Sequence, residues 1–343
     1  MGRYLVRRLL QTIPLLFFVS VILFVLMNNI GDPLATMGGR ERLRSADRER
    51  LARQLGLDQP VYMQYIYWLI GNDWMTFDMD GDGEPETAGN RRGVLRGDLG
   101  TSMVERRPVG EIIGQRIPNT LILMIPAEIV IVVVSLAIGM ISALKQYSFL
   151  DHFFTGLSFI TYSMPVFWLG LTLMFVFSVN FKTWGLPYLP TLGMYDPGAD
   201  KTIFELIRHM ILPVTTIAAI SVAAYSRYIR SNMLEVIHSD YVRTARSKGL
   251  HEQLVVWRHA FKNAALPLVT LIGLDLPFLL AGALVTESIF QWPGMGRLFL
   301  HHLDRADYPV LMGILMLVSV MVVLFQILTD ITYTWLDPRI RYA

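Results

Sequence analysis

The chain has 343 residues, of which 53% are hydrophobic, and it contains no cysteine. Its 30 Lys and Arg residues nearly balance its 28 Asp and Glu residues, which leaves a net charge of +2. Without a basic excess, the composition gives no indication of nucleic-acid binding. The absence of cysteine excludes disulfides, thiol catalysis and thiolate metal sites.

Six apolar runs are long enough, or nearly long enough, to cross a lipid bilayer. Three of them contain no charged residue and are each at least 22 residues long, at residues 9–31, 153–181 and 308–329. Three others carry one internal charge or are shorter, at residues 118–144, 210–226 and 264–286. Because about 20 apolar residues cross the hydrocarbon core, the pattern predicts an all-α polytopic membrane protein with six transmembrane helices.

The basic residues predict the orientation of these helices. Arg3, Arg7 and Arg8 precede the first apolar run, and positive charges favour the cytoplasmic side of a membrane. The N-terminus is therefore expected in the cytoplasm and, by alternation, so is the C-terminus. The arginines between residues 40 and 116 oppose this orientation only weakly, because loops longer than about 60 residues translocate largely regardless of charge.

Three regions follow from this topology. Residues 1–31 hold the N-terminal cytoplasmic residues and the first transmembrane helix, which is too long for a signal peptide and lacks a small-residue cleavage site. Residues 32–112 form an external segment, periplasmic or extracellular, with an insertion at residues 72–96. Residues 113–343 form a five-helix core that carries a cytoplasmic loop at residues 231–263.

The cytoplasmic loop contains the charged stretch DYVRTARSKGL, residues 240–250. Apolar residues recur there at helical spacing from residue 233 to residue 248, at Leu234, Ile237, Tyr241, Val242 and Ala245. Gly249 is expected to end this helix, because glycine accepts the left-handed conformation of a C-cap. A second amphipathic helix is expected before Pro267, with an apolar face of Leu254, Trp257 and Phe261. A basic helical loop is also ordinary in multi-span proteins, so the pattern alone leaves its role open.

Residue identity adds to this pattern. The stretch DYVRTARSKGL resembles the cytoplasmic loop of the permease subunits of ABC importers, in particular the dipeptide/oligopeptide/nickel permease family. Ala245 and Gly249 match the general importer pattern, whereas Leu266 and Pro267 lie farther from the glycine, as in the peptide-type branch. The resemblance continues in order along the chain, at residues 97–123, 161–170, 189–193, 286–298 and 330–342.

The resemblance implies the type I ABC importer permease fold and a location in a prokaryotic inner membrane, embedded in lipid. It also implies three kinds of protein partner: a second permease subunit that is a related but different chain, two ATPase subunits that hold ATP and Mg²⁺, and an extracytoplasmic solute-binding protein. The cytoplasmic loop would dock on an ATPase subunit through Asp240, Tyr241, Arg243, Thr244, Ala245, Arg246, Lys248 and Gly249.

No catalytic motif accompanies these features. The sequence has no GxxxxGK[ST] phosphate-binding loop, no HExxH and no GxSxG. We therefore predict a non-catalytic subunit without a cofactor of its own.

Two charged residues, Glu128 and Asp275, fall inside predicted transmembrane helices. A charge at mid-bilayer costs at least ~2.5 kcal/mol, so both should face the bundle interior, either on the substrate path or in a structural pair with an Arg, Thr or Tyr. The candidates for the path are Thr161, Ser163, Asp275 and Glu287. The residues Phe290, Pro293, Gly294 and Gly296 match a family signature and are expected to form a turn at the outer mouth.

The acidic stretch DMDGDGEPE lies within the predicted insertion. Its acidic side chains occupy positions one, three, five, seven and nine of a calcium loop, at Asp78, Asp80, Asp82, Glu84 and Glu86. Position twelve is Gly89, where an EF-hand needs a bidentate glutamate. A weak Ca²⁺ site and a solvated acidic loop both fit.

The transported substrate follows only from the resemblance, which implies di- or oligopeptides, with nickel and oligosaccharides as alternatives. An ion-coupled secondary transporter is the rival class, since Glu128 and Asp275 could serve as coupling carboxylates. That class is built from internal repeats, which this sequence does not display.

Overall fold

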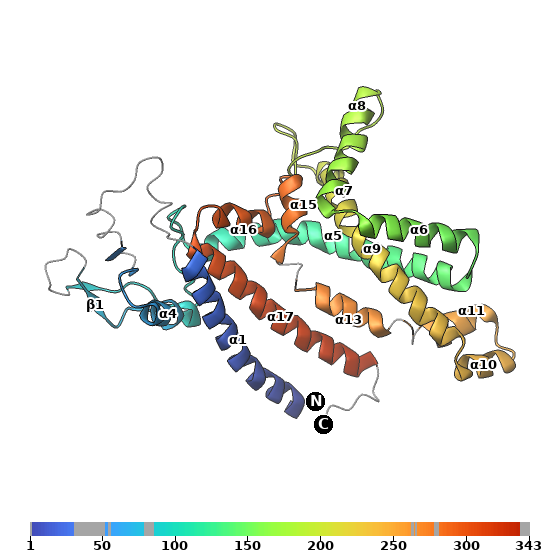
Figure 1. The fold of residues 1–343 in the computed structure, drawn as a ribbon, viewed down its shortest axis with the longest axis horizontal. Coiled ribbons are helices and arrows are strands. Elements are labelled where there is room, and N and C mark those ends of the chain that lie inside the picture. The colour runs from blue at the N-terminus through green and yellow to red at the C-terminus, as the bar shows by residue number, and fades with distance from the viewer. Residues whose placement is uncertain are drawn as a thin grey trace. The chain divides into compact units, whose positions relative to one another are not determined.

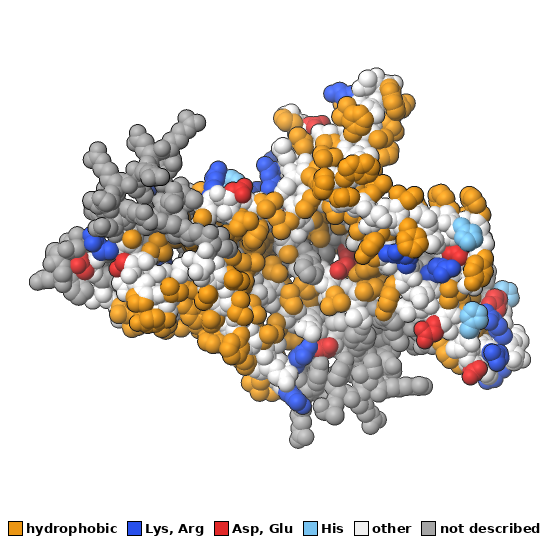
Figure 2. Space-filling model, in the orientation of Figure 1, with side chains coloured by type: hydrophobic (Ala, Val, Ile, Leu, Met, Phe, Trp, Pro, Cys, Tyr) orange, Lys and Arg blue, Asp and Glu red, His pale blue; other side chains and the backbone are white. Residues whose placement is uncertain are grey.

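Helices account for most of the chain in the computed structural model, which describes residues 2–30, 52–53, 56–78, 86–261, 264, 266–277 and 281–336 (Figure 1). Within these residues, five helical stretches are long and apolar enough to cross a membrane, at Val6–Asn29, Val109–Leu144, Val166–Thr183, Ile203–Ile237 and Tyr308–Thr332. Their outer faces carry large apolar side chains, which Figure 2 shows over much of the visible surface. Lipid tails are the solvent that such faces require.

The chain divides into two compact units. The first contains Met1–Pro118 and Leu298–Val323, and the second contains Asn119–Arg297 and Leu324–Ala343. Three helices have residues in both units: α5 (Val109–Leu144), α16 (Met295–Leu303) and α17 (Tyr308–Leu336).

In the first unit, the core lies between α1 (Gly2–Ile30), α4 (Val61–Ile70) and the first half of α17. Met27, Leu311 and Met312 are buried there, and Trp68 of α4 packs against them. The Ser20 hydroxyl lies 2.8 Å from the Tyr65 hydroxyl, so a hydrogen bond joins α1 to α4. The aromatic segment predicted near residues 62–70 is thus a helix packed on the first transmembrane helix.

The predicted insertion contains a short hairpin. Strands β1 (Thr76–Phe77) and β2 (Thr87–Ala88) pair antiparallel, with Thr76 opposite Ala88. At the base, Asn72 donates its N–H to the Arg91 carbonyl and accepts the Arg91 N–H on its side-chain oxygen, both at 2.9 Å. A short 3₁₀ turn, η1 (Val94–Arg96), follows. The two hydrogen bonds between Asn72 and Arg91 thus close the base of the hairpin. Of the predicted calcium ligands, Asp80, Asp82 and Glu84 lie outside the described residues, so this site stays a prediction.

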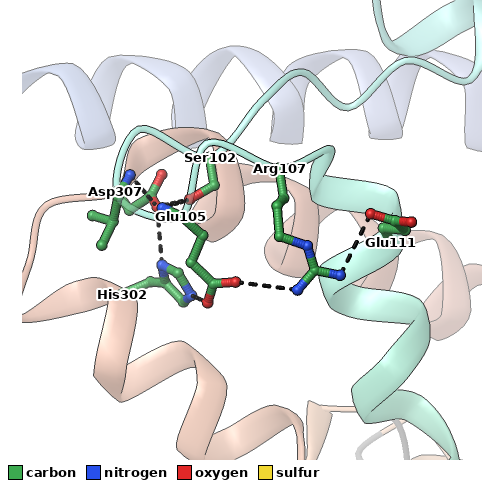
Figure 3. A network of polar contacts seen from close by, with 7 residues as sticks. Ser102, Glu105, Arg107, Glu111, His302 and Asp307 are labelled. Atoms are coloured by element: carbon green, nitrogen blue, oxygen red, sulfur yellow. Dashed lines mark hydrogen bonds and ion pairs between the residues drawn. The ribbon is translucent and has the colours of Figure 1, made fainter.

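A buried polar network fixes the end of the segment predicted to be external, in the first unit (Figure 3). The Asp307 carboxylate is fully buried and accepts hydrogen bonds from the Ser102 hydroxyl, from two backbone N–H groups of the same turn and from His302 Nδ1 at 3.0 Å. Burial alone would raise the pKa of Asp307, but these hydrogen bonds lower it below its ordinary value. Glu105 lies 3.4 Å from His302 Nε2. Because Ser102 donates to Asp307 rather than to His302, the network locks a turn and does not form a nucleophilic triad.

In the second unit, α9 (Ile203–Ile237) is the central helix, and both α6 (Phe149–Ser163) and α7 (Val166–Met174) pack on it. The second half of α5 also approaches closely. A Cβ atom added to Gly139 of α5 would lie 2.8 Å from the Ile229 side chain, so only glycine fits at this contact. The chain after α7 continues through a π-helical turn, η2 (Phe175–Asn180), into α8 (Phe181–Thr183).

The structure divides two of the predicted apolar runs. The uncharged run 153–181 is not one helix, because α6 ends at Ser163 and Pro165 precedes α7. The run 264–286 is described as two helices, α13 (Leu266–Asp275) and α15 (Leu284–Ile289), with Gly282 at φ +80° between them. Five of the six predicted spans therefore meet the length of a membrane crossing in the described residues.

Candidate functional site

The charged stretch forms a helix of its own at the end of α9. Helix α9 ends at Ile237, and α10 (Asp240–Ser247) begins after a break at His238 and Ser239, so the predicted continuous helix over 233–248 is wrong at this point. Gly249 follows at φ +74°, which confirms its predicted role as the terminating residue. The chain then enters α11 (Glu252–Leu254) and the π-helical turn η3 (Val255–Phe261).

Helix α10 has one buried face and one exposed face. Val242 is fully buried and Ala245 is 5% exposed, and both belong to a core cluster that includes Met233 of α9 and Val255 of η3. All the other predicted docking residues are exposed: Asp240, Tyr241, Arg243, Thr244, Arg246, Lys248 and Gly249. Ala245 therefore anchors the helix to the unit, whereas its neighbours present a charged surface.

The second helix of the loop turns a different face inward than its spacing predicted. Val255, Val256 and Ala260 are buried, whereas Leu254 and Trp257 of the expected apolar face are 41% and 58% exposed. The π-helical turn inserts an extra residue per turn, which rotates the following side chains away from the α-helical pattern. Trp257 instead packs edge-on against Phe261, with ring centroids 5.4 Å apart.

A salt bridge closes the turn at Gly249. The Arg246 guanidinium donates two hydrogen bonds to the Glu252 carboxylate, at 2.7 and 3.2 Å. Hydrogen bonding from Arg246 lowers the pKa of Glu252. Both side chains are substantially exposed, so the pair contributes little to stability. Its effect is to restrict the angle between α10 and α11.

A second, buried salt bridge joins α9 to the start of α6. Arg230 donates two hydrogen bonds of 2.8 Å to the carboxylate of Asp151, which is 2% exposed. The hydrogen bonds from Arg230 lower the pKa of Asp151. One turn earlier on α9, the Arg227 guanidinium lies over the Tyr162 and Phe159 rings, at 4.6 and 5.2 Å from their centroids. The segment of α9 that leads into α10 is thus fixed to α6.

The predicted path residues have different environments. The Thr161 and Ser163 hydroxyls donate to carbonyls one turn back in α6, at 2.9 and 2.8 Å. Asp275 accepts a hydrogen bond from the Tyr225 hydroxyl of α9, which matches the predicted structural pair with a tyrosine. Glu128 is partly buried, and its Oε1 has no hydrogen-bond partner among the described residues.

The remaining path candidate, Glu287, is fully buried and belongs to the predicted outer-mouth turn. Its carboxylate accepts hydrogen bonds from the Thr120 hydroxyl at 3.2 Å and from the Arg297 N–H at 3.0 Å. A Cβ atom on Gly294 would lie 2.5 Å from Glu287 Oε2, which explains the glycine. Phe290 is also buried. This environment favours a structural role for Glu287, at the centre of the turn, over a position on the path.

Several residues that position the site had no distinct signal in the sequence. Asp151, Tyr225, Thr120 and Trp292 act through partners far away in the chain, and Trp292 donates its indole N–H to the Asn119 carbonyl at 2.8 Å. For the buried salt bridge, the sequence offered one indication: Asp151 lies just before an apolar run.

The described residues thus define a polytopic helical membrane protein with an exposed, rigidly held basic helix between two apolar segments. The chain belongs to the family described as the binding-protein-dependent transport system inner membrane component, whose model matches residues 135–342. The model of the N-terminal region of such membrane components matches residues 1–124.

Similar proteins cover the full length of the chain. The oligopeptide transport system permease protein AppB of Bacillus subtilis is 39% identical over 344 residues, which is 100% of both chains. The dipeptide transport system permease protein DppB of Escherichia coli is 37% identical over 359 residues, covering 100% of this chain and 99% of the relative. The glutathione transport system permease protein GsiC of Salmonella typhimurium is 37% identical over 346 residues, or 100% of both chains.

Membership in this family confirms the predicted class. The chain is a non-catalytic, membrane-spanning permease subunit of an ABC importer, and it works with a solute-binding protein and an ATPase. The rival class, an ion-coupled secondary transporter, is not supported by the family membership.

Proposed function

We propose that the chain forms one half of the translocation pore of an importer for di- or oligopeptides, and that α10 receives the movement of an ATPase subunit. The names of the similar proteins, which refer to oligopeptides, dipeptides and glutathione, support a peptide substrate. Nickel and oligosaccharides are the alternatives, because selectivity in this kind of importer resides largely in the separate solute-binding protein.

The observation that carries the proposal is the two-faced burial of α10. Switching a two-state pore from about 1:99 to 99:1 requires roughly 5.5 kcal/mol of differential binding. A docked helix delivers such energy only if it does not slide on its own support. Val242 and Ala245 form the buried face of α10. The Arg230–Asp151 pair fixes the segment of α9 that precedes it, and the Arg246–Glu252 pair restrains the turn that follows it. The exposed residues between Asp240 and Gly249 form the surface that faces the partner.

The assembly and orientation form part of this proposal. The second half of the pore is a related but different permease chain, and two ATPase subunits hold ATP and Mg²⁺. The N- and C-termini and α10 face the cytoplasm, which the arginines before the first transmembrane helix support. The hairpin region is external, and a weak Ca²⁺ site in its acidic loop is compatible with the sequence.

The path for substrate is proposed to pass Thr161, Ser163 and Asp275. Asp275 is the strongest of these candidates, because its carboxylate is not fully buried and the nearby Glu128 has an unpartnered oxygen. Two carboxyl groups in an apolar bundle attract the positively charged amino end of a peptide.

The direct test is uptake by the complete transporter in liposomes, with labelled dipeptide and the solute-binding protein outside and ATP at the ATPase subunits. Arg243→Glu reverses a charge on a side chain that is 77% exposed, and we expect ATP-dependent uptake to fall at least tenfold because like charges meet at the interface. Lys201→Glu, a charge reversal at another exposed residue outside the loop, is the matched control and should leave uptake unchanged. Uptake that follows an ion gradient without ATP would contradict the proposal.

A further inference from the structure

Three metal-ligating side chains meet at the N-terminal end of α9, in the second unit. Glu205 and His209 lie one turn apart on the helix, and Asp196 comes from the loop before it. One donor atom from each residue lies within 4.8 Å of the other two. None of the three takes part in the coupling helix or in the path described above.

The contacts of His209 define what its two ring nitrogens face. Its Nδ1 lies 3.1 Å from the Gly193 carbonyl oxygen. A carbonyl only accepts hydrogen bonds, so Nδ1 carries the proton. Nε2 then faces Glu205 Oε1 at 3.2 Å and Asp196 Oδ1 at 3.6 Å. In a neutral imidazole this nitrogen is an acceptor, so three electron-pair donors converge on one point while the His209 side chain is 1% exposed.

The spacing of these atoms suits a transition-metal ion. Zinc binds histidine nitrogen and carboxylate oxygen at about 2.1 Å in tetrahedral geometry, which places neighbouring ligand atoms about 3.4 Å apart. The observed separations from Nε2, 3.2 and 3.6 Å, lie on either side of this value. Asp196 is 59% exposed and can rotate to complete the geometry.

Neighbouring groups orient the three side chains, as hydrogen-bonding groups around known metal sites orient the ligands. A ligating histidine commonly donates its other N–H to a backbone carbonyl, and here Gly193 accepts it while donating its own N–H to the Phe290 carbonyl at 2.8 Å. Arg208 lies 3.4 Å from the second oxygen of Glu205 and so orients Oε1 toward His209. Thr202 caps the helix by accepting the Glu205 N–H.

We propose that Asp196, Glu205 and His209 bind one divalent transition-metal ion, preferably Zn²⁺, with water in the fourth position. The ion would fasten the loop at Gly193–Asp196 to α9 and, through Gly193, to the turn that carries Phe290. A doubly protonated His209 between the two carboxylates is the competing explanation, and it requires no metal.

The test uses the full chain without a histidine tag in lipid nanodiscs, stripped with a chelator and titrated with Zn²⁺ by calorimetry. We expect one Zn²⁺ ion per chain. Asp196→Asn removes an exposed ligand without disturbing the core and should weaken binding at least tenfold. Asp200→Asn changes an exposed acidic residue of the same loop and should bind Zn²⁺ like the unchanged chain. Equal binding by both variants, or no binding at one per chain, would overturn the proposal.

A second measurement separates the metal from the protonated histidine. Co²⁺ in place of Zn²⁺ should give the visible absorption of a tetrahedral site, and this band should be lost in His209→Gln. Zn²⁺ should also raise the midpoint of thermal unfolding of the unchanged chain and not that of Asp196→Asn. An unfolding midpoint that responds to pH but not to Zn²⁺, with no Co²⁺ band, identifies the imidazolium pair and contradicts the metal site.

Discussion

The two ends of α9 place their charged side chains differently. At the C-terminal end, α10 exposes its charged residues and buries only Val242 and Ala245. At the N-terminal end, polar groups turn inward, with His209 and the neighbouring Glu287 buried and hydrogen-bonded. The C-terminal end presents a surface for binding. The N-terminal end holds the turn that carries Phe290 and the loop at Gly193–Asp196. The difference predicts that changes at the first end alter coupling, while changes at the second alter stability.

The largest effect is expected from Gly249→Val. At φ +74° a β-branched residue is strained, although a Cβ atom would meet no neighbour there. The turn between α10 and α11 should change direction, so ATP-coupled uptake should be abolished while membrane insertion is retained. Gly198→Val, at φ +84° in an exposed loop, carries similar strain away from the coupling helix. Normal uptake with Val at 249 would remove this turn from the mechanism.

Breaking the buried salt bridge should affect both coupling and stability. Asp151→Ala leaves Arg230 without its carboxylate. Because the Arg230 side chain is 27% exposed, the loss of unfolding free energy should be below the roughly 3–5 kcal/mol of a fully buried pair but above that of a surface pair. Adding Arg230→Met should restore most of this loss, which thermal unfolding of the purified complex would measure. Asp73→Ala breaks an exposed pair with Arg96 and should cost less than about 1 kcal/mol. Equal losses from both alanine variants would argue against a buried anchor.

The same salt bridge has a defined pH dependence. Arg230 lowers the pKa of Asp151 in the folded chain, so the pair contributes stability at pH values above the unfolded pKa of aspartate, about 3.9. This contribution should decrease as the pH falls through the lowered folded pKa. In Asp151→Ala, unfolding midpoints recorded from neutral to acidic pH should lose that part of the dependence.

At the other end of α9, Thr120→Val should lower stability without uncoupling transport. The Thr120 hydroxyl donates to Glu287 and accepts the Met295 N–H at 2.7 Å. Leaving these buried groups without their partner costs about 1–3 kcal/mol. Thr183→Val removes an exposed hydroxyl that donates to the Val179 carbonyl one turn back and should change the unfolding midpoint little. The ATP hydrolysed per peptide transported should be the same in both variants.

The smallest effect is expected from removal of the hairpin. Replacing residues 76–88 with two glycines should close a β-turn, because the Gly89 N–H already donates to the Met75 carbonyl at 2.9 Å. The replacement therefore keeps the base of the hairpin. Uptake should stay within about twofold of the full chain, a rate change equivalent to about 0.4 kcal/mol. Loss of transport would show that the hairpin contributes to function.

Much of the fold could be predicted because lipid imposes a simple rule on sequence. Uncharged runs of sufficient length indicated the transmembrane segments. The ability of glycine to adopt the left-handed conformation indicated the turn at Gly249. The helix breaks at Pro165 and Ser239 were missed because apolar spacing continues across them. The inward face of the second loop helix was also missed, since a π-helical turn leaves no mark in an α-helical pattern.

The candidate site could also be predicted only in part. The reason here is that its supporting contacts join residues far apart in the sequence. Local charge and spacing indicated α10, but the residues that hold it act over long sequence separations, as Asp151 does with Arg230. Glu287 was a path candidate because a charge near an apolar run suggests function, and that role stays a prediction. Its burial against Thr120 and Gly294 depends on packing that the sequence does not display.

The central claim is that α10 lies on the cytoplasmic side and presses against an ATPase subunit. Because the chain contains no cysteine, Arg243→Cys introduces a single thiol on the exposed face of α10. In the assembled transporter, a short thiol-reactive cross-linker should join this residue to an ATPase subunit, with a yield that changes when ATP binds, and a membrane-impermeant reagent outside the cell should not label it. Labelling from outside, or the absence of any cross-link to an ATPase subunit, would contradict the account.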